Sequence, residues 1–274
     1  MLRSRIASFL RHDTRLRTFV YALTNNLYTS PQISAGKNKS KRNKNSQVIP
    51  VAVILCGCGR LDGTEISEAI SAAINLRQNN MKPEFYAPDI EYPSVDHLAK
   101  KPDATCPKRN ALVEGARLAR TCCKPLCECE ACTHGGLLIP GGFGAARTLS
   151  NFIEKGAQCT VLPDLQHLIE DFYCEKKPIG SMCIASAIVA RVLKGVTVTL
   201  GKDSPKERWP HGQFMKRIKE MGAKLEMKDV TEIAVDKDYK VISTPAWLCE
   251  QATYAEVHEG IGNLVKMLKK CMNH

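Results

Sequence analysis

Short apolar runs alternate with helical segments from residue 48 to the end of the chain. The first run, Val48–Cys56, is almost continuously apolar, as strands are when both faces of a parallel sheet are covered. Helical spacing follows over 65–78, and further apolar runs begin at Leu137 and Ile179. More strands are expected at 84–87, 196–200, 223–227, 233–235 and 241–244, and more helices after Cys183 and at 108–120, 165–174, 215–221 and 249–270. This alternation predicts an α/β fold whose mostly parallel sheet lies between two layers of helices.

Charge is distributed unevenly along the chain. The net charge is +11, but residues 1–47 hold ten Lys or Arg and one acid, Asp13, and so carry +9, which leaves +2 for 48–274. A basic nucleic-acid surface spread over the folded part is therefore not expected. No apolar run reaches the roughly 18 residues of a membrane span, so no membrane partner is expected either. The 44% hydrophobic content suffices for one core, and 48–274 is predicted to be one domain.

The first residues resemble a targeting sequence. Met1–Arg11 alternates apolar residues with arginines and lacks acids and a secretory apolar core. This pattern predicts a mitochondrial transit peptide and a matrix location, with 30–47 as a disordered basic linker. A disordered basic arm without a targeting role is the alternative.

Cys183 is the leading candidate for a nucleophile. It ends an apolar strand, leads at once into a helix, and is flanked at −2 and +2 by the small residues Ser181 and Ala185. A nucleophile elbow needs small residues there because the turn is tight. A helix N-terminus would also favour the thiolate and lower the pKa. A buried cysteine before an ordinary helix is the alternative.

A glycine-rich turn and an acidic residue are expected near Cys183. Gly141 and Gly142 follow the strand at 137–139, and their N–H groups could face a developing oxyanion, or simply form a tight turn. Glu65, after the first strand, could remain protonated beside sulfur and act as general acid and base. Alternatively, Thr64 caps the helix and Glu65 lies in its first turn. Glu68 is expected to be a solvated or capping residue.

Histidines and the other cysteines give weaker signals. His211, on a loop in Trp209–Gly212, is the best candidate for a base. Five of the thirteen cysteines lie close together: Cys122, Cys123, Cys127, Cys129 and Cys132. A second, properly spaced pair is missing, so reduced loop cysteines are favoured over a zinc site or a local disulfide, and no metal is expected.

Several of these segments together resemble a known family. The chain is similar to the ElbB-like and mitochondrial glutamine amidotransferase-like class 1 domain proteins, of the PfpI branch of the class I glutamine amidotransferase superfamily. The resemblance is carried by 57–59, 62–66, 140–146, 177–185, 244–246 and 260–262. It implies a flavodoxin-like three-layer sandwich and a Cys183 nucleophile with Glu65 as its acidic neighbour. It also implies an oxyanion pocket near Gly141, Gly142 and the Ile184 N–H.

The resemblance also bears on activity. Glutamine amidotransferases complete their triad with His-x-Glu on a late strand, where this chain has Thr244-Pro245-Ala246, so glutaminase activity is not expected. The family instead implies a slow, cofactor-independent glyoxalase III-like lyase, or a deglycase-like hydrolase, acting on small aldehydes or glycated amines. A non-catalytic mitochondrial redox sensor with an oxidisable Cys183 is the alternative. Relatives in the superfamily often form dimers, which makes a homodimer the expected assembly.

Overall fold

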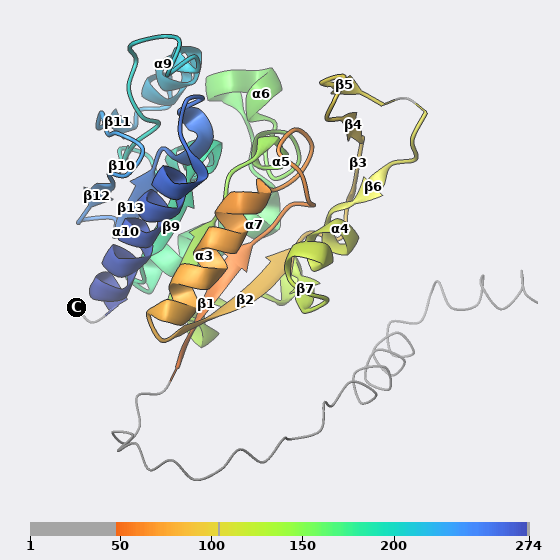
Figure 1. Ribbon diagram of the computed structural model, residues 1–274. Coiled ribbons are helices and arrows are strands. Elements are labelled where there is room, and N and C mark those ends of the chain that lie inside the picture. Colours follow the sequence, from red (N-terminus) through yellow and green to blue (C-terminus); the bar gives the residue numbers. More distant parts are fainter. Residues whose placement is uncertain (1–47, 104, 273–274) are drawn as a thin grey trace, which may run out of the picture. The chain divides into compact units, whose positions relative to one another are not determined.

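The computed structural model describes residues 48–103 and 105–272, and the predicted transit peptide and linker lie outside them. A seven-stranded sheet runs through the centre of this part of the chain (Figure 1). In spatial order its strands are β12 (Ala234–Asp236), β13 (Val241–Thr244), β9 (Ile179–Met182), β8 (Gly136–Ile139), β1 (Ile49–Ile54), β2 (Met81–Ala87) and β7 (Cys123–Pro125). Every neighbouring pair is parallel except the edge pair β12–β13. The predicted mostly parallel sheet is confirmed.

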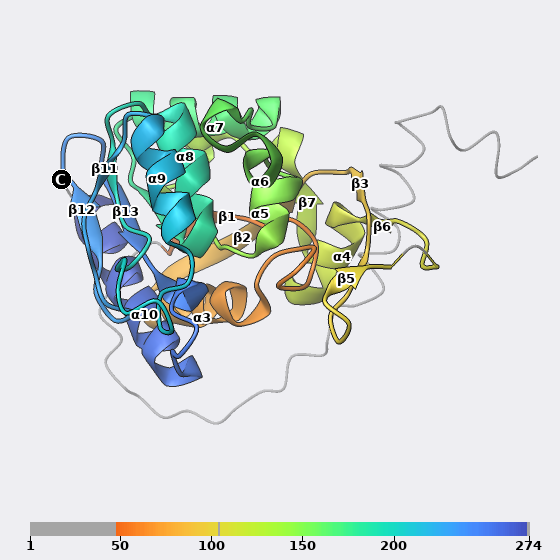
Figure 2. The same cartoon turned by 90° about the horizontal axis from the view of Figure 1, so that it is seen from above.

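Helices cover both faces of this sheet. One face carries α3 (Ile66–Gln78), α4 (Ala111–Leu118) and α10 (Tyr254–Met272), and the other carries α5 (Phe143–Arg147), α7 (Pro163–Cys174), α8 (Ser186–Val192) and α9 (Gly212–Glu220) (Figure 2). The short elements are α6 (Phe152–Lys155), η1 (Leu126–Glu128), η2 (Ala131–Thr133), η3 (Gly156–Gln158), η4 (Cys183–Ala185) and η5 (Ala246–Leu248). Three two-stranded sheets pair β3 (Glu91–Tyr92) with β6 (Arg109–Asn110), β4 (Val95–Asp96) with β5 (Lys101–Pro102), and β10 (Thr197–Val198) with β11 (Lys224–Leu225). The three-layer sandwich is therefore the observed architecture.

Helix α3 turns a partly polar face toward the sheet. Its inward residues include the small or apolar Ala69, Ala72 and Leu76, but also the polar Glu68, Ser71 and Asn75. Its three isoleucines, Ile66, Ile70 and Ile74, are 40–46% exposed. They recur every four residues and so form one stripe on the solvent side. An exposed apolar stripe on a helix is the usual mark of an interaction surface.

The C-terminal helix begins later than the predicted residue 249. The chain first forms the short turn η5, and α10 then starts at Tyr254. Thr253 and Glu256 explain this start, because the Thr253 Oγ1 accepts from the Glu256 N–H (3.2 Å) and the Glu256 carboxylate accepts from the Thr253 N–H (2.7 Å). This reciprocal pair is a capping box.

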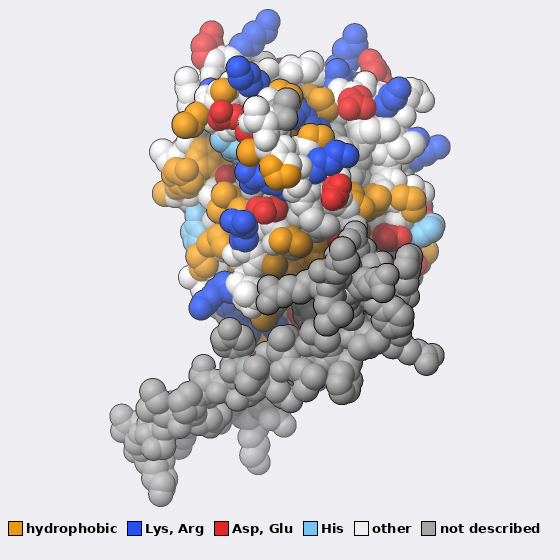
Figure 3. Space-filling view, turned by 90° about the vertical axis from the view of Figure 1, so that its right-hand side faces the viewer, with side chains coloured by type: hydrophobic (Ala, Val, Ile, Leu, Met, Phe, Trp, Pro, Cys, Tyr) orange, Lys and Arg blue, Asp and Glu red, His pale blue; other side chains and the backbone are white. Residues whose placement is uncertain are grey.

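The surface carries mixed charge. On the face shown in Figure 3, basic and acidic side chains are interspersed among apolar and neutral ones. In the part of the chain that the structure describes, no helix has the length and apolar character needed to cross a membrane.

Candidate functional site

Loops from the carboxyl ends of several parallel strands meet around Cys183. The pocket at this edge is small, with a volume of about 30 Å³. Its lining consists of Arg60, Glu65, Gly142, Phe143, Cys183, Ile184, His211, Phe214, Trp247 and Leu248. The carboxyl edge of a parallel sheet is where ligands bind in α/β folds. The pocket admits only a very small ligand.

Cys183 occupies a strained turn between a strand and a helix. β9 ends at Met182, Cys183 has φ +55°, and η4 then leads directly into α8. A left-handed backbone costs a non-glycine residue roughly 1–2 kcal/mol. Ser181 and Ala185, the small residues on either side, are fully buried. This is the strand–turn–helix geometry expected from the sequence.

The carboxyl group closest to Cys183 belongs to Glu68, not to the predicted Glu65. Glu68 is fully buried, and its Oε2 accepts the Gly141 N–H at 2.7 Å. A Cβ atom added to Gly141 would lie 2.8 Å from this Oε2 and 3.1 Å from the Cys183 sulfur. Burial, and next the charge of Glu65, raise the pKa of Glu68 to about 8. Glu68 is thus mostly neutral at pH 7, and the expectation of a solvated or capping residue was wrong.

Glu65 lies one helical turn away and caps α3. Its Oε2 accepts the Glu68 N–H at 2.7 Å and the Ser67 hydroxyl at 2.6 Å. The alternative with Thr64 as the cap is wrong, because the Thr64 hydroxyl oxygen accepts the Cys56 N–H instead (2.6 Å). Glu65 also lines the pocket, so the structure brings both carboxyl groups to Cys183 but in different surroundings.

The backbone N–H groups near Cys183 divide into two sets. Those of Ile184 and Gly142 are directed at the Cys183 sulfur and favour its thiolate. The Gly141 N–H, predicted to face an oxyanion, instead binds Glu68. Gly142 has φ +96°, a conformation that glycine adopts without strain. Of the three N–H groups predicted to face a developing oxyanion, those of Gly142 and Ile184 remain available.

The thiol of Cys183 is not held as a free thiolate. Burial raises its pKa well above 9.0, and the Glu68 and Glu65 charges act in the same direction. The Ile184 and Gly142 N–H groups oppose this effect without reversing it. The expectation of a lowered pKa was wrong because it considered the helix N-terminus and not burial. Cys183 is only 7% exposed, and burial disfavours the charged thiolate.

His211 lies at the pocket in an ionic cluster. Its Nε2 is 3.6 Å from Glu250, whose carboxylate also binds Arg60 at 2.5 Å. The His211 ring stacks on Phe214, with centroids 5.5 Å apart. Burial lowers the pKa of His211, so the ring is neutral at pH 7. The structure thus places the predicted base candidate in the lining of the pocket that Cys183 also lines.

The cysteine-rich loop takes no part in this site. All thirteen cysteines are free thiols. Among the described residues, no group of three or more His, Cys, Asp or Glu side chains is arranged to hold a metal ion. His134, which follows the loop, is buried against Tyr86, with its Nε2 3.3 Å from the Tyr86 hydroxyl. Its role there is to pack the loop onto β2.

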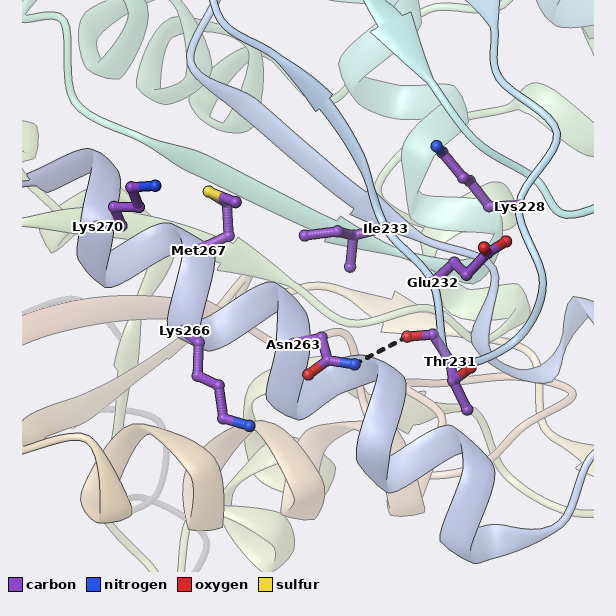
Figure 4. A pocket seen from close by; sticks show the side chains of 8 residues that line it. All are labelled: Lys228, Thr231, Glu232, Ile233, Asn263, Lys266, Met267 and Lys270. Atoms are coloured by element: carbon purple, nitrogen blue, oxygen red, sulfur yellow. Dashed lines mark hydrogen bonds between the residues drawn. The ribbon is translucent and has the colours of Figure 1, made fainter.

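A larger groove of about 610 Å³ lies elsewhere, between α10 and the segment before β12 (Figure 4). It is lined by Lys228, Thr231, Glu232, Ile233, Asn263, Lys266, Met267 and Lys270, none of which lines the Cys183 pocket. Asn263 donates to the Thr231 carbonyl at 3.0 Å and so ties the helix to the segment. The groove contains no nucleophile comparable to Cys183.

Known proteins are similar to this chain in sequence, and a solved structure is similar to it in fold. The chain is 39% identical over 218 residues to "ES1 protein homolog, mitochondrial" from Rattus norvegicus, covering 79% of this chain and 81% of that protein. It is equally similar, over the same shares, to the human "Glutamine amidotransferase-like class 1 domain-containing protein 3, mitochondrial". These relatives confirm the predicted mitochondrial location. No protein-family model matches the chain.

A solved structure agrees with these relatives. An isoprenoid biosynthesis protein with an amidotransferase-like domain from Ehrlichia chaffeensis superposes with a TM-score of 0.72 at 30% sequence identity. The superposition covers 81% of this chain and 99% of that one. The shared architecture extends over the whole of that protein.

Proposed function

Since this chain belongs to the mitochondrial ES1 family of glutamine amidotransferase-like class 1 proteins, we propose that it is a cofactor-independent, glyoxalase-like enzyme for small 2-oxoaldehydes. The observation that carries the proposal is the Cys183–Glu68 pair at a small pocket. Once the carboxyl group has lost its own proton, it can pass the single remaining proton of the pair back and forth while the sulfur acts as nucleophile. The pocket volume of about 30 Å³ favours a two- or three-carbon aldehyde over a glycated amine.

The reaction begins when the pair has lost one proton. Glu68 takes the proton of the Cys183 thiol while the sulfur adds to the aldehyde carbon. The carbonyl electrons move to oxygen, where the Gly142 and Ile184 N–H groups stabilise the charge. Glu68 then returns the proton to this oxygen, which gives a hemithioacetal.

Isomerisation and hydrolysis complete the reaction. Glu68 removes the proton from the former aldehyde carbon and delivers it to the neighbouring carbonyl carbon, while the hydroxyl proton of the hemithioacetal passes to the neighbouring carbonyl oxygen. The hemithioacetal thereby becomes a thioester that carries a hydroxyl group on the next carbon. Water then cleaves the thioester, releasing a 2-hydroxy acid and the Cys183 thiol. The sum is isomerisation plus hydration, so no electron acceptor is required.

Two other activities fit the site less well. A redox sensor needs an accessible, low-pKa thiol, whereas Cys183 is buried and its pKa is raised. A glutaminase needs a basic partner, and the residues after β13 are Pro245, Ala246 and Trp247. His211 is the remaining candidate base, available to activate the water that cleaves the thioester.

Methylglyoxal consumption by the full chain tests the proposal. We expect turnover to fall by 10²–10⁴-fold in Cys183→Ala and in Glu68→Gln, the range for loss of a nucleophile or a general acid–base group. Cys159→Ala, which removes another buried thiol, and Glu84→Gln, which removes a partly buried carboxylate on β2, should keep wild-type turnover. Wild-type turnover no faster than that of Cys183→Ala would refute the glyoxalase assignment.

A further inference from the structure

Hydrogen bonds link Glu65 to the opposite wall of the pocket. The Glu65 carboxylate accepts the Ser67 hydroxyl at 2.6 Å, and the Ser67 oxygen accepts the Trp247 Nε1–H at 2.7 Å. Ser67 belongs to the first turn of α3, whereas Trp247 lies in η5 after β13. The three residues therefore join two loops that are far apart in the sequence.

A second set of bonds returns from Trp247 to Glu65 through Glu68. The Trp247 backbone N–H lies 3.5 Å from Glu68 Oε1, and the Glu68 N–H donates to Glu65 at 2.7 Å. The Gly141 peptide spans the same two residues, since its N–H binds Glu68 and its carbonyl accepts the Glu65 N–H at 2.9 Å. Glu68 is thus enclosed in a closed ring of bonds.

The backbone before Trp247 is strained in a way that supports this ring. Ala246 is fully buried and has φ +46°, which is costly for a residue with a Cβ atom. This conformation turns the chain immediately before the Trp247 N–H. The Trp247 ring in turn packs edge-on against Tyr254, with centroids 4.9 Å apart.

We propose that Glu65 is a positioning residue, which acts with Ser67 to hold Trp247 and the first turn of α3 so that the Glu68 carboxyl faces the Cys183 sulfur. The inference rests on the proposed function in so far as Glu68 is the proton carrier of Cys183. Both carboxyl oxygens of Glu68 accept backbone hydrogen bonds in this arrangement. Oε2 accepts the Gly141 N–H, and Oε1 accepts the Trp247 N–H. Without the Ser67 link, the side-chain bond that holds Trp247 against α3 is missing.

The test separates this role from simple helix capping. Glu65→Ser keeps a good N-cap but removes the carboxylate that Ser67 binds. Ser67→Ala removes the link to Trp247 and leaves the cap intact, and Ser67→Thr restores the hydroxyl. The readout is the rate at which iodoacetamide labels Cys183, measured by mass spectrometry as a function of pH, which requires no aldehyde turnover.

We expect the pH of half-maximal labelling to fall by at least one unit in Glu65→Ser and Ser67→Ala, because the charges of Glu68 and Glu65 raise the pKa of the Cys183 thiol, and to return to the wild-type value in Ser67→Thr. A pocket that merely opens would change the rate equally at every pH and leave this midpoint in place. An unchanged midpoint in Ser67→Ala, which keeps the charge of Glu65, would overturn the proposal. Absence of methylglyoxal turnover in the wild type would instead refute only the glyoxalase assignment, because labelling does not depend on it.

Discussion

Replacing Glu68 by glutamine should change how the stability of the protein depends on pH. The pKa of Glu68 is about 8 in the fold, against an ordinary value of 4.5. Between these pH values the folded protein retains a proton that the unfolded chain has released. Stability therefore falls as pH rises from 4.5 to 8, and at 1.36 kcal/mol per pH unit the loss is at most about 5 kcal/mol. Relaxation around a buried charge reduces this figure, and we expect at least about 2 kcal/mol.

The assay is urea unfolding of wild type and Glu68→Gln at pH 5 and pH 9. Glutamine does not titrate, so the variant should gain stability relative to wild type by that amount between the two pH values. Glu84→Gln is the control, because ion pairing lowers the pKa of Glu84, led by its hydrogen bond to Lys82. Glu84→Gln should change the stability by the same amount at pH 5 and pH 9, because the contribution of the Glu84 carboxylate is lost only as pH falls below about 4.5. A difference between wild type and Glu68→Gln that is equal at pH 5 and pH 9 would refute the buried neutral carboxyl.

Three further predictions concern activity, assembly and a helix end. kcat/KM for methylglyoxal should rise with pH through an apparent pKa of about 8, and this limb should be absent in Glu68→Gln; a flat wild-type profile would contradict proton transfer through Glu68. Light scattering should show a wild-type dimer and a monomeric Ile70→Glu whose Tm is lower and no longer depends on protein concentration, because we propose that the isoleucine stripe of α3 packs against a second copy; a monomeric wild type would exclude this. Lys176→Gly should stabilise the protein by about 1 kcal/mol in urea unfolding, since Lys176 is exposed with φ +54° just after α7; equal or lower stability would show that the turn is unstrained.

The sequence predicted the sheet and most helices because their signals are local. Apolar runs such as Val48–Cys56 and the helical spacing of 65–78 depend only on neighbouring residues. The edge strand β7 was not predicted, since Cys123–Pro125 is short and lies in a cysteine-rich segment with no apolar alternation. The small sheets formed by β3–β6 and β4–β5 were also missed, because their strands are too short for an apolar alternation to be visible.

The site was predicted less completely because burial depends on distant partners. Ile66, Ile70 and Ile74 lie on the solvent side of α3, although apolar residues at this spacing are typical of the inner face of a helix. Glu68 lies on the buried side with Ala72 and Leu76, at spacings of four and eight residues, and this was the available signal. What makes a buried Glu68 tolerable is the Gly141 N–H, 73 positions away in the chain.

The ring around Glu68 also has a consequence for the order in which the protein matures. Its members come from residues 65–68, 141 and 247, and the Ser67–Trp247 bond closes a loop of 180 positions. Until the chain has folded as far as η5, Cys183 lacks the wall formed by Trp247 and its sulfur is accessible. A chain that is still unfolding or refolding, as during passage through a membrane, would therefore carry Cys183 as an ordinary reactive thiol. Folding of η5 closes the ring around Glu68 and adds the Trp247 wall to the pocket.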